Sequence, residues 1–158
     1  MSHEVLKSIR DYLNANGVSF RELEHAPTRT SEESAAARGE DLNVGAKALL
    51  LKTDGFFRLF VLPADRKLDS TAIRRQLGVR KTRFASVDEL YELVGLVPGA
   101  VPPFGEPILP FELYADEAVG EETNRVAFNA GSLSHSIIMS AEDWLMLAKP
   151  IRFCFSKL

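Results

Sequence analysis

Hydrophobic residues recur at two spacings along this chain, and the spacing predicts which segments form helices and which form strands. Val5, Ile9, Tyr12 and Leu13 recur at helical spacing, and Gly17 stands where such a helix ends. Further helices are expected after residues that can cap an N-terminus, namely Thr30, Asp69, Ser86 and Ser140. Two of these caps, followed by Glu33 and Glu89 respectively, have the spacing of capping boxes.

Strands are expected where apolar residues alternate or run together between turn signals. The candidate segments are VSFREL, GAKALLLK, FFRLFVLP, ILPFELYAD, RVAFNA, HSIIM and IRFCF. Asp54-Gly55 is a hairpin signal between the second and the third of them. Because strands outnumber helices and most neighbours are joined by hairpin-length turns, we expect one α+β domain over residues 1–158, with a mixed, largely antiparallel sheet flanked by helices.

Composition narrows the class of protein. The chain has 158 residues, of which 46% are hydrophobic, and no apolar run approaches the roughly 20 residues of a membrane span. The N-terminus has no apolar signal region, and a single cysteine, Cys154, cannot form an internal disulfide, so we expect a cytoplasmic protein with Cys154 as a small core residue. The net charge of −3 means that any contact with RNA requires a local basic patch.

Lys47 is the first residue whose position suggests chemistry. In AKALLLK its side chain shares one strand face with Leu49 and Leu51, where an ammonium group is costly unless it is paired. An edge-strand lysine whose amine extends into solvent explains the same pattern, and spacing alone favours that explanation.

The segment between Pro98 and Pro110 carries five prolines and two glycines, too many for a helix or a central strand. Prolines fix φ and donate no hydrogen bond, so we expect the amides of Gly99, Ala100 and Val101 to be held toward one point. Preorganised backbone donors stabilise an oxyanion or an ester carbonyl. A rigid structural crossover explains the same residues, and the loop taken alone favours it.

Other polar groups are less specific. Asn129-Ala130-Gly131-Ser132 follows a predicted strand, and its glycine indicates either a close approach of backbone to a ligand or a tight turn. His135 lies among serines, but neighbours on a strand alternate faces and the sequence places no acid partner for a catalytic triad. No histidine has the spacing of metal ligands, so neither a metal nor another cofactor is predicted.

A basic cluster occupies seventeen positions and contains Asp69 as its only acid. Its members are Lys67, Arg74, Arg75, Arg80, Lys81 and Arg83. Phosphate contact and a solvated helix face explain such a cluster equally well.

Several segments, taken in order, resemble the YbaK/prolyl-tRNA-synthetase editing-domain family. They are GAKALLLK, LPADRKLD, LGVRKTRFASVDEL, GLVPGAVPPFG and NAGSLSHSIIMSAEDWL, and the match runs over roughly residues 20 to 150. The strand lysine, Lys47, and the G-x-x-x-P loop from Gly99 to Pro103 are its most specific parts. The resemblance implies an α+β fold with a barrel-like sheet and a deacylase that acts in trans on mischarged tRNA, without a metal or other cofactor.

The resemblance also implies roles for residues. Lys47 would anchor the aminoacyl-adenosine end, and Gly99, Ala100, Val101, Pro102 and Pro103 would hold the scissile ester. Substrate contacts are expected from Thr30, Phe104, Asn129, Gly131 and Ser132, and tRNA contacts from the basic cluster. Aminoacyl-tRNA is the expected partner, with prolyl-tRNA synthetase as a further candidate and no role for DNA or a membrane.

The substrate follows from the loop by comparison within the family. The branch that removes cysteine carries a G-G-x-S-P-x-G-Q-K-K loop, from which this chain departs at Ala100, at Pro102 and in the Gln-Lys-Lys segment. The loop is closer to that of branches that remove alanine, so alanine or another small residue on tRNA(Pro) is expected, with Cys-tRNA(Pro) as the alternative substrate. A non-catalytic tRNA-binding module of the same fold stays open, as does a serine or thiol hydrolase that uses Ser134, His135 or Cys154.

Overall fold

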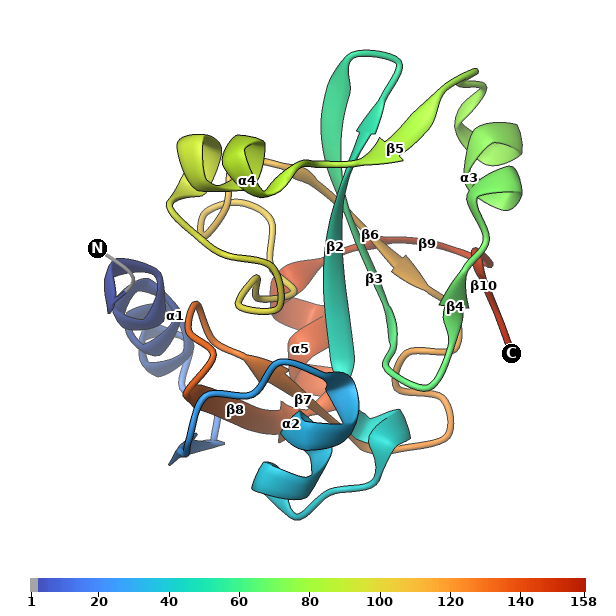
Figure 1. Cartoon of the computed structure of the whole chain (residues 1–158). Helices are drawn as coiled ribbons and strands as arrows, with labels where there is room; N and C mark the ends of the chain where they lie inside the picture. The colour runs from blue at the N-terminus through green and yellow to red at the C-terminus, as the bar shows by residue number, and fades with distance from the viewer. Residues whose placement is uncertain (1–2) are drawn as a thin grey trace.

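The computed structural model describes residues 3–158, which form helices packed around three β-sheets (Figure 1). In chain order the elements are α1 (His3–Ala15), β1 (Phe20–Glu24), α2 (Ser31–Arg38), a 3-10 turn η1 (Leu42–Val44), β2 (Ala46–Thr53), β3 (Phe56–Pro63), β4 (Lys67–Leu68), α3 (Ser70–Leu77), β5 (Thr82–Phe84), α4 (Val87–Val94), β6 (Glu112–Asp116), β7 (Arg125–Asn129), β8 (His135–Ser140), α5 (Ala141–Ala148), β9 (Ile151–Phe153) and β10 (Ser156–Lys157).

The largest sheet has the strand order β5-β2-β3-β6-β9. Its β2–β3 hairpin is antiparallel, whereas β3 and β9 both run parallel to β6. A second sheet, β1-β8-β7, is wholly antiparallel, and β4 pairs with β10 in a third. A bridge between Gly45 and Ala127 joins the two larger sheets. The predicted α+β, largely antiparallel fold is confirmed, with the strands divided among three sheets.

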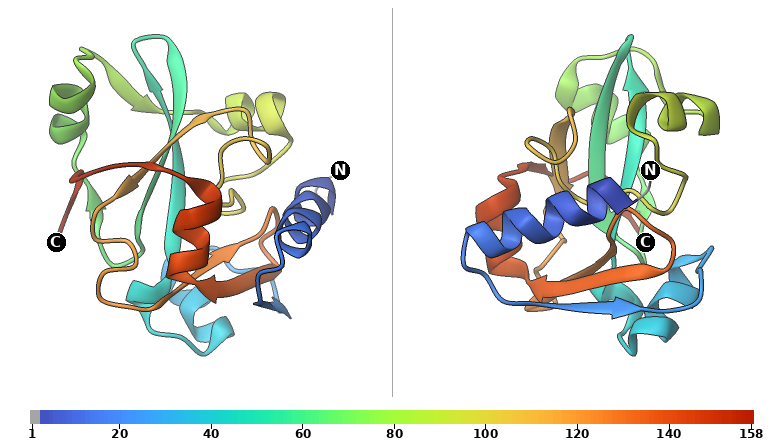
Figure 2. Two further views of the ribbon diagram at one scale, coloured as in Figure 1. Left: turned by 180° about the vertical axis from the view of Figure 1, so that it is seen from behind. Right: turned by 90° about the vertical axis from the view of Figure 1, so that its left-hand side faces the viewer.

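Apolar residues cover both faces of the β2–β3 hairpin. On one face, Leu50 and Leu59 belong to a core that includes Ile9 of α1 and Trp144 of α5. On the other face, Phe60 joins a smaller core with residues of α3, β6 and the C-terminal segment. Figure 2 shows α1 and α5 beside the three-stranded sheet. The hairpin is therefore a stiff central element from which side chains can be positioned precisely.

Most predicted element boundaries are confirmed, because turn and capping residues act locally. Thr30, Asp69, Ser86 and Ser140 each accept a hydrogen bond at the start of a helix. The capping box at Ser86 is complete, but Glu33 accepts from the Arg29 amide instead of closing a box with Thr30.

Two strand predictions were inaccurate, and three short strands were not predicted. The strand expected from residue 108 begins only at Glu112, since the prolines before it prevent ladder hydrogen bonds. The strand expected to include Cys154 ends at Phe153, and Cys154 is exposed instead of lying in the core. The short strands β4, β5 and β10 were not predicted, because two or three residues carry no periodicity.

No helix within residues 3–158 is long and apolar enough to cross a membrane.

Candidate active site

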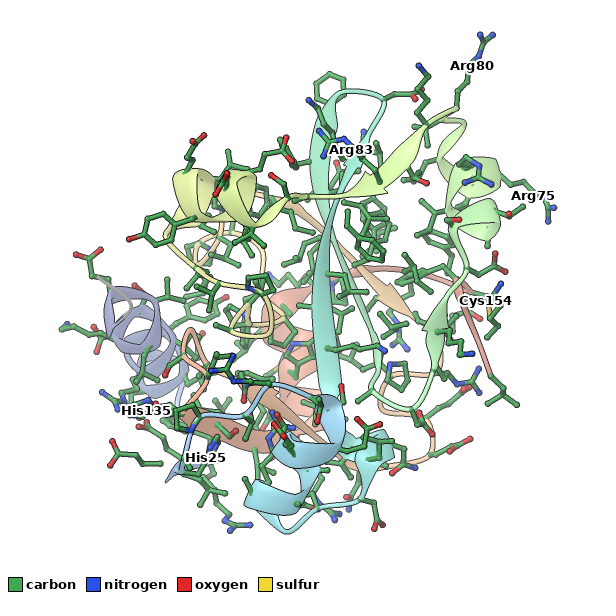
Figure 3. All side chains as sticks on the ribbon, in the orientation of Figure 1. His25, Arg75, Arg80, Arg83, His135 and Cys154 are labelled. Carbon is green, nitrogen blue, oxygen red and sulfur yellow. The ribbon has the colours of Figure 1, made fainter. Side chains whose placement is uncertain are left out.

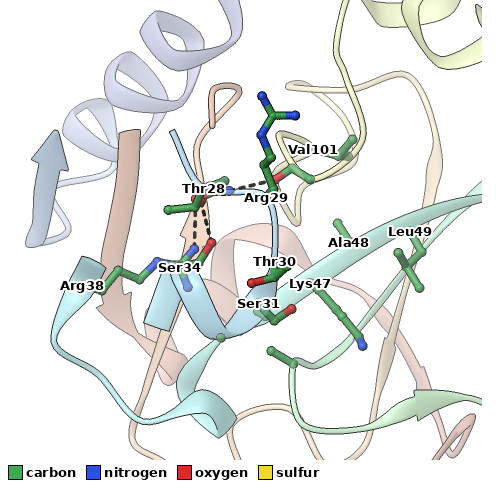
Figure 4. A pocket seen from close by; sticks show the side chains of 15 residues that line it. Thr28, Arg29, Thr30, Ser31, Ser34, Arg38, Lys47, Ala48, Leu49 and Val101 are labelled. Atoms are coloured by element: carbon green, nitrogen blue, oxygen red, sulfur yellow. Dashed lines mark hydrogen bonds between the residues drawn. The ribbon is translucent and has the colours of Figure 1, made fainter. Parts of the chain in front are cut away.

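A cavity of about 170 Å³ opens beside the first half of β2 (Figure 4). Its wall combines the segment before α2, α2 itself, the start of β2, the proline-rich loop and the end of β7. The residues that line it are Thr28, Arg29, Thr30, Ser31, Ser34, Arg38, Gly45, Ala46, Lys47, Ala48, Leu49, Ala64, Gly99, Val101 and Asn129. Segments far apart in the sequence therefore meet at one cavity.

Lys47 lines this cavity as expected. β2 lies inside the five-stranded sheet, but β5 pairs only with Leu51–Thr53, so the first half of β2 has β3 as its single strand neighbour in that sheet. The cavity occupies this unpaired side. Burial lowers the pKa of the half-buried Lys47 amine, while the negative charges of Glu32 and Asp65 oppose that shift. Lys47 thus supplies a partly desolvated cation at the cavity.

Three hydrogen bonds hold the Gly99–Pro103 loop from outside. The Asn129 Nδ2 group donates to the Gly99 carbonyl across 2.9 Å, and the Gly131 amide donates to the Ala100 carbonyl across 2.9 Å. The indole Nε1 of Trp144 donates to the Pro103 carbonyl, also across 2.9 Å. Asn129, Gly131 and α5 therefore fix three carbonyls, two near the start and one at the end of a loop that has few internal hydrogen bonds.

The expectation that three loop amides converge needs correction. The Ala100 amide is not available, because it donates to the Val97 carbonyl across 3.1 Å. The Ala100 carbonyl faces Gly131, and in a trans peptide the following amide, that of Val101, points the opposite way. Gly99 and Val101 both line the cavity, and within residues 3–158 no acceptor is bonded to either amide, so their two N–H groups are the loop's candidate donors to a ligand.

The other predicted site residues divide into two groups. Thr30 and Asn129 line the cavity beside Gly99 and Val101. Ala100, Pro102, Pro103, Phe104, Gly131 and Ser132 do not.

Two of those outside the cavity have a clear structural position. Phe104 is 1% exposed and packs edge-to-face against Phe128 in the main core. Gly131 adopts a φ of +80°, and a Cβ there would lie 3.0 Å from the Val5 side chain of α1. The close approach that this glycine permits in the structure is to helix α1.

A buried hydroxyl pair in the cavity wall was not predicted. Thr28 and Ser34 are 4% and 6% exposed, and their hydroxyl oxygens lie 2.7 Å apart. Figure 4 shows this hydrogen bond between the segment before α2 and the helix. Serine and threonine near a helix start are ordinary capping residues, so nothing in the sequence marks this pair as part of a cavity.

Arg38 was also missed. It ends α2, and its half-buried guanidinium reaches the cavity wall (Figure 4). Burial lowers the pKa of Arg38 to about 10, against a smaller opposing effect of Glu40. An arginine in the last turn of a helix normally complements the helix dipole, which is why its position in the sequence suggested no further role.

The basic cluster is only partly assembled. Arg74, Arg80, Lys81 and Arg83 line a separate groove of about 600 Å³ together with Lys52, Asp54, Gly55 and Thr82. Lys67 and Arg75 do not line it, and Figure 3 shows Arg75 on the outer side of α3. Within the groove, Arg83 is paired with both carboxylate oxygens of Glu89.

The alternative nucleophiles lie outside the cavity (Figure 3). His135 has the acid partner that the sequence could not place, since its Nε2 lies 3.0 Å from Glu24 Oε2 and its Nδ1 lies 3.1 Å from Ser132 Oγ. Ser132 Oγ, however, already accepts from the Ser134 amide. Local desolvation and then the hydrogen-bonded Glu117 raise the pKa of the exposed Cys154 thiol, which disfavours a reactive thiolate.

Comparison with known proteins identifies this arrangement. Residues 25–147 match the family model described as "Aminoacyl-tRNA editing domain". The chain belongs to the aminoacyl-tRNA editing domain family. Like its family, it is an aminoacyl-tRNA deacylase, an editing hydrolase. The resemblance inferred from Lys47 and the G-x-x-x-P loop is confirmed.

Individual relatives of this editing domain are similar over nearly their whole length. The multifunctional Ser/Thr-tRNA deacylase ProXp-y of Escherichia coli (strain K12) is 36% identical over 143 residues, which cover 87% of this chain and 84% of that protein. The prolyl-tRNA editing protein ProX of Acetoanaerobium sticklandii is 30% identical and is covered to 83%. A crystal structure described as that of a candidate trans-editing enzyme for prolyl tRNA synthetase superposes with a TM-score of 0.82 at 25% identity, with 98% of each chain covered.

Proposed function

We propose that this editing domain acts in trans on tRNA that carries a small non-cognate amino acid, and that the cavity beside Lys47 binds the aminoacyl ester. The observation that carries the proposal is the meeting of Lys47, the Gly99–Pro103 loop and the hydroxyl-rich α2 segment at one cavity. A volume of about 170 Å³ suits a small amino acid next to the end of a tRNA.

The proposed chemistry needs orientation and charge stabilisation more than a protein nucleophile. A water molecule, which a hydroxyl of the terminal ribose can orient, attacks the ester carbonyl. The bond to the ribose oxygen then breaks, and that oxygen takes a proton and leaves as a hydroxyl. In this proposal the Gly99 and Val101 amides are the candidate donors to the oxyanion that forms, and the Lys47 cation stabilises negative charge nearby. Because the ester is already activated, these groups suffice for hydrolysis.

Serine and threonine join alanine as proposed substrates. Alanine was expected from the loop, but the cavity wall contains the hydroxyls of Thr28, Thr30, Ser31 and Ser34. A substrate hydroxyl can form a further hydrogen bond with such groups, which a methyl group cannot. The name of the Escherichia coli relative, a Ser/Thr-tRNA deacylase, supports the same choice.

The proposed carrier is tRNA(Pro), which the names of ProX and of the superposed structure support. Prolyl-tRNA synthetase is the proposed source of the mischarged tRNA. The groove around Arg80 and Lys81 is the proposed contact for tRNA phosphates, since Lys52 on its rim lies about 16 Å along β2 from Lys47.

The deciding experiment is deacylation of tRNA(Pro) charged separately with alanine, serine, threonine, cysteine and proline. We expect release of the first three, retention of proline, and loss of activity in folded Lys47→Ala. Binding of tRNA without hydrolysis of any species would favour the non-catalytic module instead. Full activity in Lys47→Ala would remove the proposed role of that lysine.

A further inference from the structure

The guanidinium of Arg38 makes two directed hydrogen bonds at the cavity wall. Its Nε donates to Ser136 Oγ across 2.9 Å, and its Nη2 donates to Asn129 Oδ1 across 3.1 Å. Ser136 is fully buried, and Asn129 is 8% exposed. No carboxylate within residues 3–158 forms an ion pair with Arg38. Half-burying a cation without a carboxylate partner costs stability, so its placement needs another reason.

Asn129 connects Arg38 to the Gly99–Pro103 loop through hydrogen bonds. Its Oδ1 accepts from Arg38 and from Ser136, which leaves Nδ2 to donate to the Gly99 carbonyl across 2.9 Å. These partners admit only one orientation of the amide, because a flipped amide would set its NH₂ group against the guanidinium.

Gly99 is the loop position that most needs external support. Its φ of +89° lies in the left-handed region, and it has no side chain to pack. The peptide unit between Gly99 and Ala100 is held at its carbonyl by Asn129 and at its amide by the Val97 carbonyl. The next peptide unit contains the Val101 amide that faces away from Gly131. The direction of that amide therefore depends both on the bond from Gly131 to the Ala100 carbonyl and on how firmly the preceding Gly99 carbonyl is held.

We propose that Arg38 is a positioning residue for the hydrolytic reaction, which acts through Asn129 on the Gly99 carbonyl and so sets the direction of the Val101 amide. The inference rests on the proposed function, in which the Gly99–Pro103 loop binds the ester. Arginine is suited to this task because its planar fork donates to Ser136 and Asn129 together. A lysine keeps the charge but cannot reproduce both bonds.

The test is a double-mutant cycle with Arg38→Met, Asn129→Ala and the double variant, with kcat and KM measured on the best substrate. Because a displacement of about 1 Å at a reacting group costs up to about 100-fold in rate, we expect each single variant to lower kcat by roughly 10- to 100-fold with KM changed less than about twofold. The double variant should be no slower than the slower single one. Arg38→Lys should recover part of the rate, and Arg21→Met, at an exposed arginine of β1, should keep the wild-type rate.

Two results would overturn the inference. A rise in KM with kcat unchanged would show that Arg38 binds tRNA directly, and multiplicative effects in the double variant would show that it acts without Asn129. Circular dichroism identifies the folded variants, and Arg38→Lys replaces Arg38→Met if the latter does not fold. Hydrogen exchange at the Ala100 amide gives a readout independent of activity. The exchange should be faster in every folded Arg38 variant, and unchanged exchange would refute the positioning role. This result can be read even if the wild-type protein hydrolyses no aminoacyl-tRNA and the proposed function fails.

Discussion

The indole Nε1 of Trp144 donates a hydrogen bond to the carbonyl oxygen of Pro103 across 2.9 Å. Trp144 is fully buried on α5, and this bond connects the end of the Gly99–Pro103 loop to that helix. The loop thus owes its shape to its own prolines and to donors from distant segments. Interference with those donors should affect stability and hydrolysis together.

Trp144→Phe tests the stabilising part of this arrangement. The phenyl ring keeps most apolar contacts but leaves the buried Pro103 carbonyl without its donor, which costs roughly 1–3 kcal/mol. We expect a lower urea midpoint with an unchanged m-value, and a reduced kcat in the folded protein. A variant as stable as the wild type would show that the carbonyl finds another partner.

Thr28→Val and Ser34→Ala test the proposed reading of a substrate hydroxyl. Each removes one member of the buried hydroxyl pair with little change in size. We expect kcat/KM for seryl-tRNA to fall about 2- to 10-fold relative to alanyl-tRNA, which corresponds to one hydrogen bond. Alanyl-tRNA serves as the internal control, and an equal loss on both substrates would argue against a specificity role.

The pKa of Lys47 should respond to the charge of Asp65. Burial lowers this pKa from its usual value, and the carboxylates of Glu32 and Asp65 raise it again. Asp65→Asn removes one of these charges and should lower the pKa of Lys47 further, so that the ammonium is lost at a lower pH. The measurement is an NMR titration of the Lys47 side chain, with Asp88→Asn on α4 as a control. An upward shift would contradict the electrostatic environment described here.

Glu89 should make stability depend on pH in the acid range. The Arg83 guanidinium and then the Ser86 amide lower the pKa of this carboxyl to about 2. A depressed folded-state pKa contributes stability that is present above the usual value of 4.5 and is lost as pH falls toward 2. Glu89→Gln should therefore melt at a lower temperature than the wild type at pH 7, and the difference should shrink between pH 4.5 and pH 2. A difference that stays constant over this range would mean that the charge is not responsible.

Arg80→Gln and Lys81→Gln test the basic groove. If each side chain neutralises one phosphate, each variant should raise KM for every aminoacyl-tRNA alike and reduce the salt slope of binding by about 1. Arg75→Gln on the outer side of α3 is the matched control, and it should leave both quantities unchanged. Equal effects in all three variants would indicate only general charge attraction.

The local features of this fold could be predicted because they depend on neighbouring residues. Thr30, Asp69 and Ser86 cap helices through their own side chains, and Asp54-Gly55 turns the hairpin because both residues adopt positive φ. The sequence likewise identified Lys47 and the Gly99–Pro103 loop, because the order of motifs along the chain can be recognised without knowledge of their contacts.

The support of the site could not be predicted, because its contacts join residues far apart in the chain. Arg38, Asn129 and Gly99 come from α2, β7 and a loop, and no periodicity relates them. Their meeting depends on the Gly45–Ala127 bridge, which brings the two larger sheets together. For the same reason the sequence could not show that Phe104 packs in the core or that Gly131 lies against α1.

The sequence by itself determined the helices, the hairpin, the family and the two motifs of the site, since each is written in residues close together or in a fixed order. Only the tertiary structure decided which amides of the loop have no acceptor, which hydroxyls line the cavity and which cation is hydrogen-bonded to the residue that supports the loop. Those choices are made by hydrogen bonds across sheets, and their geometry exists only once the sheets have packed.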